Sequence, residues 1–334
     1  MNADKRRLNT SNLSAFICVY QRLRCFFQQP ASGAGFSLRG TLVPPVRWRT
    51  EVRRGLKSAP QKPLRTLAIV FCLPSLVAAQ DAAAIVRRAL AEDSESEAIA
   101  RNYTYLEKQE LRTRDGNTMK VRESNTYDVT LLEGSPYRRL MAHNGQPLSA
   151  ADERKEQERL RQSIEVRKHE TEAQRQQRIA DWHRKEEKQH EPLHEIPDAF
   201  DLRFAPDESI EGHPVYVIEG APKPGYKPKT KTAFFLPKVK GRFWITKDGC
   251  QAVKIEFVTL DTISWGGIVA RVSKGTRVTV ELTRVNDEVW LPKRILVAGS
   301  ARVLLVKGYT GELDLSYSGF KKFTVESRVV SMAQ

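Results

Sequence analysis

The second half of the chain is dominated by short runs in which apolar and polar residues alternate, separated by turn-forming residues. Phe200, Leu202 and Phe204 alternate in this way, and Val285-Asn286-Asp287 supplies a turn. A period of two places successive side chains on opposite faces of a β-strand, and strands joined by short turns pair antiparallel. We therefore predict an antiparallel meander with strands at 200–204, 215–218, 241–249, 252–260, 268–272, 276–284, 288–297, 302–308, 312–320 and 323–329.

A second group of strands precedes this meander. Residues 81–101 are Ala-rich, with apolar residues at roughly helical spacing, and predict one or two short amphipathic helices. Strands then run from Tyr103 to a hairpin turn at Asp115-Gly116-Asn117, back to Leu131, and over 137–143. About ten or eleven antiparallel strands and two helical elements predict one α+β domain over residues 80–334.

Residues 149–192 interrupt the strands with a highly charged segment. Between Ala151 and Glu191 there are 11 basic and 11 acidic residues, and apolar positions are sparse. Ser149 can cap a helix. We predict a long solvated helix or helical hairpin with many i,i+4 ion pairs that ends before Pro192. It is either a charged surface insertion or an arm that binds a partner.

Several strands carry apolar residues on both faces. Phe243 and Ile245 are predicted on one face of their strand and Trp244 on the other. In the next strand, Val253, Ile255 and Phe257 are predicted to share one face. Two apolar faces require a covering layer, an enclosed cavity, or both.

Residues 62–79 have the three parts of a secretory signal peptide. Basic residues of Lys62-Pro-Leu-Arg65 come first, an apolar run follows, and Val77-Ala78-Ala79 ends it. The run is too short for an ordinary membrane span of about 20 residues. We expect cleavage between Ala79 and Gln80. Residues 1–61 are predicted to be a disordered or over-called extension; a cytoplasmic tail on a signal anchor is the alternative.

The net charge of +15 is concentrated in this leader. Residues 1–79 hold 13 basic and two acidic residues, which leaves 42 basic and 38 acidic residues for the rest. The remaining chain is therefore close to neutral, and no nucleic-acid partner is expected.

Sequence motifs for catalysis and metal binding are absent. The sequence contains no GxSxG, HExxH or P-loop motif, and no Cys/His spacing typical of zinc. His190 and His194 are four residues apart, but Pro192 between them is predicted to break the helix that would align them. Cys250 would be the sole cysteine after leader removal. We expect no catalytic site, no metal and no cofactor; an envelope hydrolase with a non-standard site is the least favoured reading.

The order of these segments resembles the LolA/LolB-type periplasmic lipoprotein carriers. The resemblance rests on the leader, the short helix, the long meander and the hairpin GRFWITKDGCQAVKIEFV, in which Trp244, Ile245 and Asp248 are similar to a Trp-Ile-Asp run. The segment Gly212–Pro224 resembles the strand and loop before that hairpin. The resemblance implies a curved, unclosed half-barrel sheet with helices on its concave side and an apolar cavity for acyl chains.

These observations lead to a functional hypothesis. We expect a non-enzymatic carrier or sensor, periplasmic or otherwise exported, that binds an acyl chain of a lipid or lipoprotein; peripheral contact with a membrane is compatible with this. The alternative is an envelope protein-interaction module that uses 149–192 and has a filled core. The candidate ligand-binding residues are Tyr103, Tyr105, Phe204, Trp244, Trp265 and Leu305.

Overall fold

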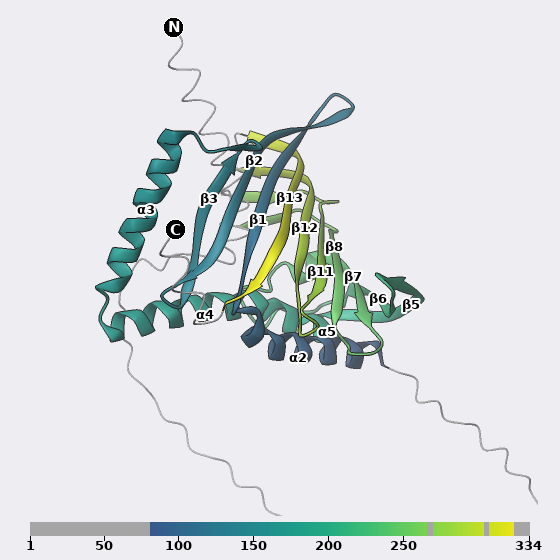
Figure 1. The fold of residues 1–334 in the computed structure, drawn as a ribbon. Coiled ribbons are helices and arrows are strands. Elements are labelled where there is room, and N and C mark those ends of the chain that lie inside the picture. Colours follow the sequence, from purple (N-terminus) through teal and green to yellow (C-terminus); the bar gives the residue numbers. More distant parts are fainter. Residues whose placement is uncertain (1–80, 266–269, 304–306, 324–334) are drawn as a thin grey trace, which may run out of the picture. The chain divides into compact units, whose positions relative to one another are not determined.

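The fold is described from a computed structural model, which covers residues 81–265, 270–303 and 307–323 (Figure 1). The predicted segments 1–61 and 62–79, and the predicted strand 323–329 beyond Phe323, lie outside these ranges. The helices are α2 (Ala82–Ala100), α3 (Ala150–Lys168), α4 (Glu172–His194), α5 (Ile196–Ala199) and the 3-10 helix η1 (Leu236–Lys238). The strands are β1 (Tyr103–Asp115), β2 (Thr118–Leu132), β3 (Ser135–His143), β4 (Gln146–Pro147), β5 (Phe200–Ile210), β6 (His213–Pro222), β7 (Val239–Thr246), β8 (Ala252–Thr259), β9 (Ile263–Trp265), β10 (Ala270–Val272), β11 (Arg277–Val285), β12 (Val289–Val303) and β13 (Lys307–Lys322).

The strands form one antiparallel sheet in the order β4-β3-β2-β1-β13-β12-β11-β8-β7-β6-β5, and β10 pairs with β12 and β9 beside this path. Within the described ranges the end strands β4 and β5 do not pair with each other, so the sheet is not closed into a barrel. The predicted α+β half-barrel is confirmed. The sheet has 13 strands, more than the ten or eleven expected, and three of them, β4, β9 and β10, are only two or three residues long.

The strand boundaries between residues 297 and 312 were predicted wrongly, since β13 also runs without a break across the gap expected between 302–308 and 312–320. Residues 288–297 and 302–308 were expected to form two strands, but β12 runs without a break from Val289 to Val303. Strand β12 pairs with β11 along its first part and with β10 at its C-terminal end, so two shorter strands pair with one long strand.

The main core lies between α2 and one side of the sheet. Asp81 caps the helix by accepting a hydrogen bond from the Ala83 amide. The helix buries Ala82, Val86 and Ala89, and these small side chains let it lie close to the strands. They pack with residues of α5, β5, β6 and β7, including Phe200, Ile218, Phe243 and Ile245. We call this side of the sheet, which carries Phe243 and Ile245, the helix face.

The opposite side, which we call the outer face, has a smaller apolar cluster. Trp244 packs there with Val215, Val217 and Val253, and Trp290 lies against them. The prediction that Trp244 faces away from Phe243 is confirmed. The prediction that Val253 shares a face with Ile255 is wrong, because the β7–β8 register shifts between Trp244 and Ile245 and reverses the alternation there.

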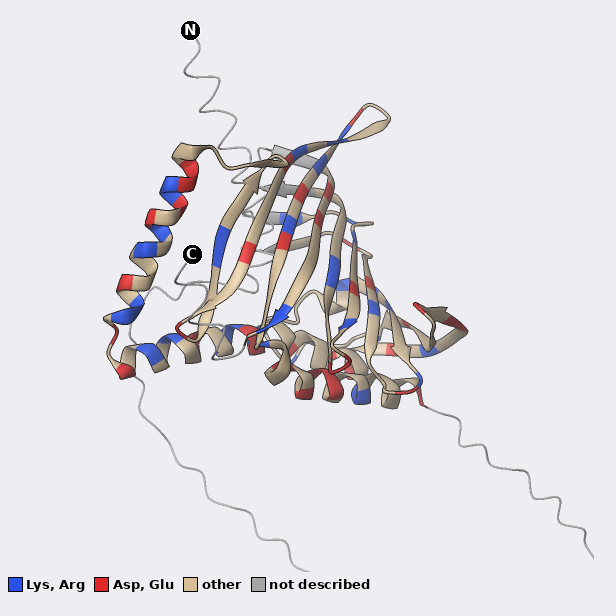
Figure 2. Ribbon diagram, in the orientation of Figure 1, with Lys and Arg blue, Asp and Glu red and all other residues tan. Residues whose placement is uncertain are grey.

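The charged segment forms the helical hairpin α3–α4 (Figure 2). Ser149 caps α3, as predicted, and Thr171 forms a capping box with Gln174 at the start of α4. Two details differ from the prediction. Helix α4 continues through Pro192 to His194, and most ion pairs inside the hairpin join residues three apart.

Among the described residues, no helix combines the length and the apolar character needed to cross a membrane.

Candidate functional site

The strand register shows which residues of the neighbouring strands project from the helix face. Residues directly opposite in an antiparallel pair project from the same face. Since Ile255 and Phe257 of β8 pack on the α2 core, every residue in register with them shares the helix face. One such transverse row consists of Phe257, Val278, Val297, Leu313, Leu111 and Glu123. It is apolar over five strands and ends in a carboxylate on β2.

A second row lies one pleat away and shows the same change. It consists of Ile255, Val280, Ile295, Leu315, Gln109, Asn125 and His143. The row is apolar on β8, β11, β12 and β13, and it becomes polar at β1. With strands roughly 4.8 Å apart, these four apolar strands span about 14 Å.

The apolar part of the rows extends beyond the α2 core. Ile255 and Phe257 pack against that core, whereas Val278, Val280, Ile295 and Val297 are partly buried and are not among its described members. The apolar rows therefore continue from the packed core onto β11 and β12. We call these four residues the apolar strip.

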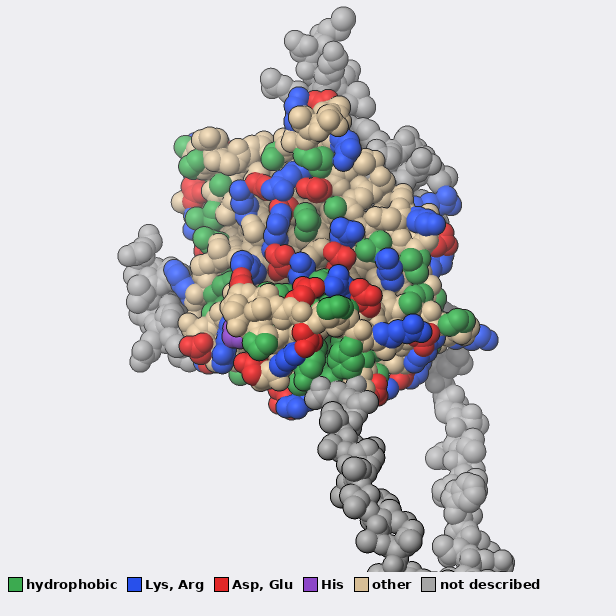
Figure 3. All heavy atoms as spheres, turned by 90° about the vertical axis from the view of Figure 1, so that its right-hand side faces the viewer, with side chains coloured by type: hydrophobic (Ala, Val, Ile, Leu, Met, Phe, Trp, Pro, Cys, Tyr) green, Lys and Arg blue, Asp and Glu red, His purple; other side chains and the backbone are tan. Residues whose placement is uncertain are grey.

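The outer face of the same strands is charged. Arg294 donates two hydrogen bonds to Asp314, at 2.9 and 2.6 Å, and Arg112 forms an ion pair with the same carboxylate at 3.0 Å. Hydrogen bonds from Lys108 and Arg112 lower the pKa of Glu110 on the same face. On the side of the molecule shown in Figure 3, basic and acidic side chains are interspersed with hydrophobic ones. The apolar strip thus belongs to the helix face alone.

The polar end of the rows has two parts. In the first, Glu107 is fully buried and accepts hydrogen bonds from Gln109 at 2.6 Å and from Arg138 at 2.9 Å. The Arg138 guanidinium lies over the ring of Tyr127, 4.0 Å from its centroid. Arg138 is thereby held by one carboxylate and one aromatic ring.

In the second part, Asn125 donates a hydrogen bond of 2.6 Å to Oε1 of Glu123. Its Oδ1 lies 2.7 Å from Nδ1 of His143, and Nε2 of that ring lies 3.0 Å from Nδ2 of Asn144. The other carboxylate oxygen of Glu123, Oε2, is buried and has no hydrogen-bond partner. We call Glu107, Gln109, Glu123, Asn125, Arg138 and His143 the polar end.

The structure does not bring the six sequence-predicted ligand residues together. Tyr105 lies on the helix face, with its ring 5.6 Å from that of Tyr317. Phe204 lies on the same face at the β5 end and is 42% exposed. Tyr103 is buried in a separate cluster with Val289 and Leu291, and its hydroxyl bonds to Glu288.

The other three are placed differently. Trp244 lies on the outer face, and its Nε1 donates to Glu208 at 2.9 Å. Leu305 and the side chain of Trp265 lie outside the described part of the chain, as do Ala79 and Gln80. Ligand contact by these residues stays a prediction.

Sequence reasoning missed the polar end almost entirely. Glu107 and Glu123 lie within predicted strands, but neither was singled out as a candidate site residue. The signal was present as Glu123 and Asn125 at a spacing of two, but polar residues at that spacing normally indicate the solvent side of a strand. Only pairing of β1 with β13, over 200 residues apart in sequence, shows that they continue an apolar row.

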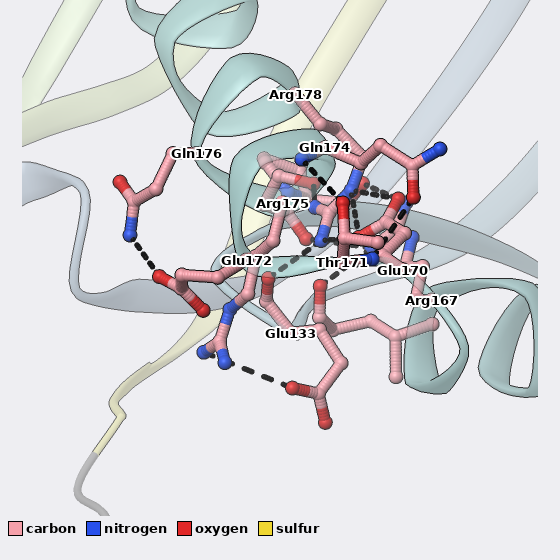
Figure 4. A network of polar contacts seen from close by, with 12 residues as sticks. Glu133, Arg167, Glu170, Thr171, Glu172, Gln174, Arg175, Gln176 and Arg178 are labelled. Atoms are coloured by element: carbon pink, nitrogen blue, oxygen red, sulfur yellow. Dashed lines mark hydrogen bonds and ion pairs between the residues drawn. The ribbon is translucent and has the colours of Figure 1, made fainter.

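A second notable region is the contact between α3–α4 and the β2–β3 turn (Figure 4). Arg178 donates to the carbonyl of Glu133 at 2.9 Å and binds both oxygens of Glu170. Arg167 donates to the carbonyls of Leu132 and Ser135, at 2.6 and 3.1 Å. Two arginines of the hairpin therefore bond backbone carbonyls at the β2–β3 turn.

Helix α3 also protects the edge strand β3. Strand β4 pairs with it only at Ala142 and His143. Farther along, Glu156 accepts from the Leu140 amide at 3.2 Å, and Arg159 donates to the Arg138 carbonyl at 2.8 Å. Side chains of the helix take the place of a neighbouring strand, which covers an edge that could otherwise pair with another chain.

Ionisable groups join α4 to α2. Arg101 donates to Glu186 at 3.1 Å and to Glu97 at 3.0 Å. Nδ1 of His190 lies 3.0 Å from Glu97 and 3.5 Å from Asp93. A hydrogen bond with Asp93 and the nearby carboxylates raise the pKa of His190, and burial raises the pKa of Glu186.

Nothing in the described part of the chain gathers three or more His, Cys, Asp or Glu side chains in a way that could hold a metal ion. Cys250 is buried against the α2 core. His190 and His194 share α4, but His190 is engaged by carboxylates of α2.

No family model matches the sequence, and no curated protein matches it. Among solved structures, one match is an outer membrane lipoprotein-sorting protein domain from Vibrio parahaemolyticus, with 11% identity, a TM-score of 0.31, and coverage of 72% of this chain and 94% of that chain. A LolA superfamily protein from Nitrosomonas europaea matches with 12% identity, a TM-score of 0.29, and coverage of 72% and 96%. The MucA/MucB complex from Pseudomonas aeruginosa matches with 8% identity, a TM-score of 0.21, and coverage of 74% and 100%. The superfamily that the sequence resembles is thus among these matches.

Proposed function

We propose that this protein is an exported, non-enzymatic carrier or sensor that binds the acyl chain of a lipid or lipoprotein on the helix face of its half-barrel. The observation that supports this most is the apolar strip, because its four partly buried aliphatic side chains continue the helix face beyond the described members of the α2 core. Burial of an acyl chain contributes about 0.8 kcal/mol per methylene. Affinity can therefore come from contact area without marked polar residues.

The same proposal includes the organisation of the chain. Residues 62–79 direct export and are removed between Ala79 and Gln80, and the half-barrel from residue 80 onward is the carrier. Intact mass measurement of protein purified from the envelope fraction tests both points, since it gives the N-terminus together with any bound lipid. A chain that keeps residues 1–61 contradicts the proposed processing.

The binding surface is tested by two substitutions on neighbouring positions of β12. Ile295 lies in the apolar strip, whereas Leu296 projects from the outer face in register with Asp314. The assay is displacement of the neutral dye N-phenyl-1-naphthylamine by dodecanol. Because an unpaired charge is costly to bury, Ile295→Asp is expected to weaken dodecanol binding more than roughly tenfold.

Leu296→Asp is the matched control, and its dodecanol affinity is expected to stay close to that of the wild type. Both variants are compared at temperatures where circular dichroism shows them folded. If the wild type binds neither dye nor dodecanol, or if both variants lose binding equally, the proposed surface is wrong.

A partner-binding role for α3–α4 is the second candidate. It is favoured by one observation: α3 has no buried residue, and Val166 on it is 66% exposed. A photo-crosslinking residue at position 166, used in envelope preparations, should give a discrete protein adduct under this hypothesis, whereas the same residue at the exposed position 204 should not. Deleting 149–192 would be a poor test, since it also removes the arginines that bond the β2–β3 turn.

A further inference from the structure

The polar end suggests which kind of amphiphile the helix face accepts, and this inference rests on the proposed function. The two transverse rows change from apolar to polar at neighbouring strands, one at β2 with Glu123 and the other at β1 with Gln109. A chain lying along the apolar strip toward Leu313 and Leu111 would bring its head next to Glu123, which pairs with Leu111. The head of a bound amphiphile thus meets a defined set of side chains.

Two members of the polar end have a buried polar atom without a hydrogen-bond partner, Oε2 of Glu123 and Nε of Arg138, and of these two residues only Glu123 has no described ion pair. The residue is 8% exposed, and its Oε1 accepts one hydrogen bond from a neutral amide. Its Oε2 is buried without a partner, and no described Lys or Arg forms an ion pair with this carboxylate. A buried carboxylate oxygen that lacks both a donor and a counter-charge is unfavourable, so a ligand that supplies both would be bound strongly.

The neighbours hold Glu123 in place but do not neutralise it. Both ring nitrogens of His143 are engaged, Nδ1 with Oδ1 of Asn125 and Nε2 with Nδ2 of Asn144. This arrangement turns the Asn125 amide group toward Glu123. The nearest assigned cation of the polar end, Arg138, is already paired with Glu107 and stacked on Tyr127.

We propose that Glu123 is a headgroup site for a protonated amine, carried by an amphiphile whose chain lies on the apolar strip. The polar end holds two carboxylates and one guanidinium, so it has an excess of negative charge. An ammonium group donates a hydrogen bond to Oε2 and balances the charge in the same contact. A divalent metal fits less well, because no described group of three or more ligating side chains exists here or elsewhere.

The experiment compares ligands that share one chain and differ in the head. Dodecylamine, dodecanol, dodecanoic acid and dodecyltrimethylammonium each displace N-phenyl-1-naphthylamine from the wild-type protein at neutral pH. Dodecylamine is expected to bind roughly tenfold or more tightly than dodecanol, in line with a hydrogen bond between charged groups. The trimethylammonium compound should be weaker than the amine because it has no N–H, and the acid should be weakest.

Glu123→Gln is expected to remove the preference for the amine while dodecanol binding changes little. Asp128→Asn is the control, since Asp128 lies on β2 and projects from the outer face, in register with Leu106 and Arg139. Asp128→Asn also replaces one carboxylate of β2 by an amide, and this variant should still bind dodecylamine more tightly than dodecanol. The comparison of the four ligands on the wild type needs no variant, so it remains decisive if Glu123→Gln does not fold.

The outcomes separate the two proposals. If dodecanol binds but the amine has no advantage, or if Glu123→Gln keeps the advantage, the headgroup site is wrong and the acyl-chain proposal stands. If none of the ligands displaces the dye, the acyl-chain proposal itself fails.

Discussion

The two ends of the sheet are held in different ways. At the β5–β8 end, α2 and α5 pack against the strands through apolar side chains, and Phe200, Ile218 and Ala199 are at most 1% exposed. At the β1–β3 end, α3 and α4 are attached mainly through arginine and glutamate side chains that bond backbone groups of the turn and of the edge strand. One end is a packed core, and the other is a hydrogen-bonded attachment.

This difference predicts different consequences of mutation. Apolar packing is non-directional and scales with the area buried, so truncation in the core lowers the stability of the whole domain. Hydrogen bonds from a charged hairpin are directional and partly exposed, so their loss should open the hairpin locally while the sheet stays folded.

The largest expected effect is in the core. Phe200→Ala should lower the free energy of unfolding by about 3–5 kcal/mol, because Phe200 is 1% exposed and is packed so closely that a Cβ on Gly220 would lie 2.8 Å from its ring. Denaturant unfolding followed by circular dichroism measures this change. Phe204→Ala on the same strand is the control, with an expected loss within about 1 kcal/mol because Phe204 is 42% exposed. Equal losses would contradict the description of the core.

An intermediate effect is expected at the attachment. Arg178→Ala removes the hydrogen bonds to Glu133 and Ser135 and the ion pair with Glu170, and should lower the free energy of opening α3–α4 by about 1–3 kcal/mol. Hydrogen–deuterium exchange of α3, α4 and β3 reports this opening. Arg184→Ala removes only an ion pair between exposed side chains, that of Arg184 with Asp181, and should change hydrogen–deuterium exchange very little. If Arg178→Ala accelerated exchange in β5–β8 to the same extent as in α3, α4 and β3, the two ends of the sheet would not be independent.

The smallest effect is a pH dependence of the α2–α4 contact. The folded pKa of His190 is raised by its hydrogen bond with Asp93 and by Glu97. A raised folded pKa means that the contribution to stability is fully present below the ordinary pKa of about 6.5 and is lost as pH rises through the folded value. Unfolding midpoints measured from about pH 6 to pH 8 should fall slightly more for the wild type than for His190→Gln. Identical slopes would show that His190 does not contribute.

The strands and their turns could be predicted from the sequence because alternation and turn residues are local signals. The charged hairpin was visible for the same reason, since its composition differs sharply from its surroundings. The face reversal of Val253 could not be predicted, because it depends on a register shift between β7 and β8 that no residue of β8 specifies alone.

The candidate site was less accessible from the sequence. Tyr105 and Phe204 were predicted as ligand-facing and do lie on the helix face, but Trp244, the most prominent aromatic of the hairpin, lies on the outer face. Glu123 can be recognised as the end of an apolar row only when the pairing of β1 with β13 is known. That pairing joins residues from opposite ends of the domain. Similarly, the sequence indicates that Arg167 and Arg178 are solvated charges, and only the structure shows that they donate hydrogen bonds to the β2–β3 turn.

The position of β13 in the sheet has a consequence for how the chain folds. This strand comes last in the described sequence, yet it lies between β1 and β12 and joins the two halves of the sheet. Its pairing with β1 closes a loop of about 200 residues, so the contact order of the sheet is high and folding is expected to be slow. Until β13 has been synthesised, the β1–β3 strands have no neighbour on that side, so the described sheet is completed only when its last strand is available.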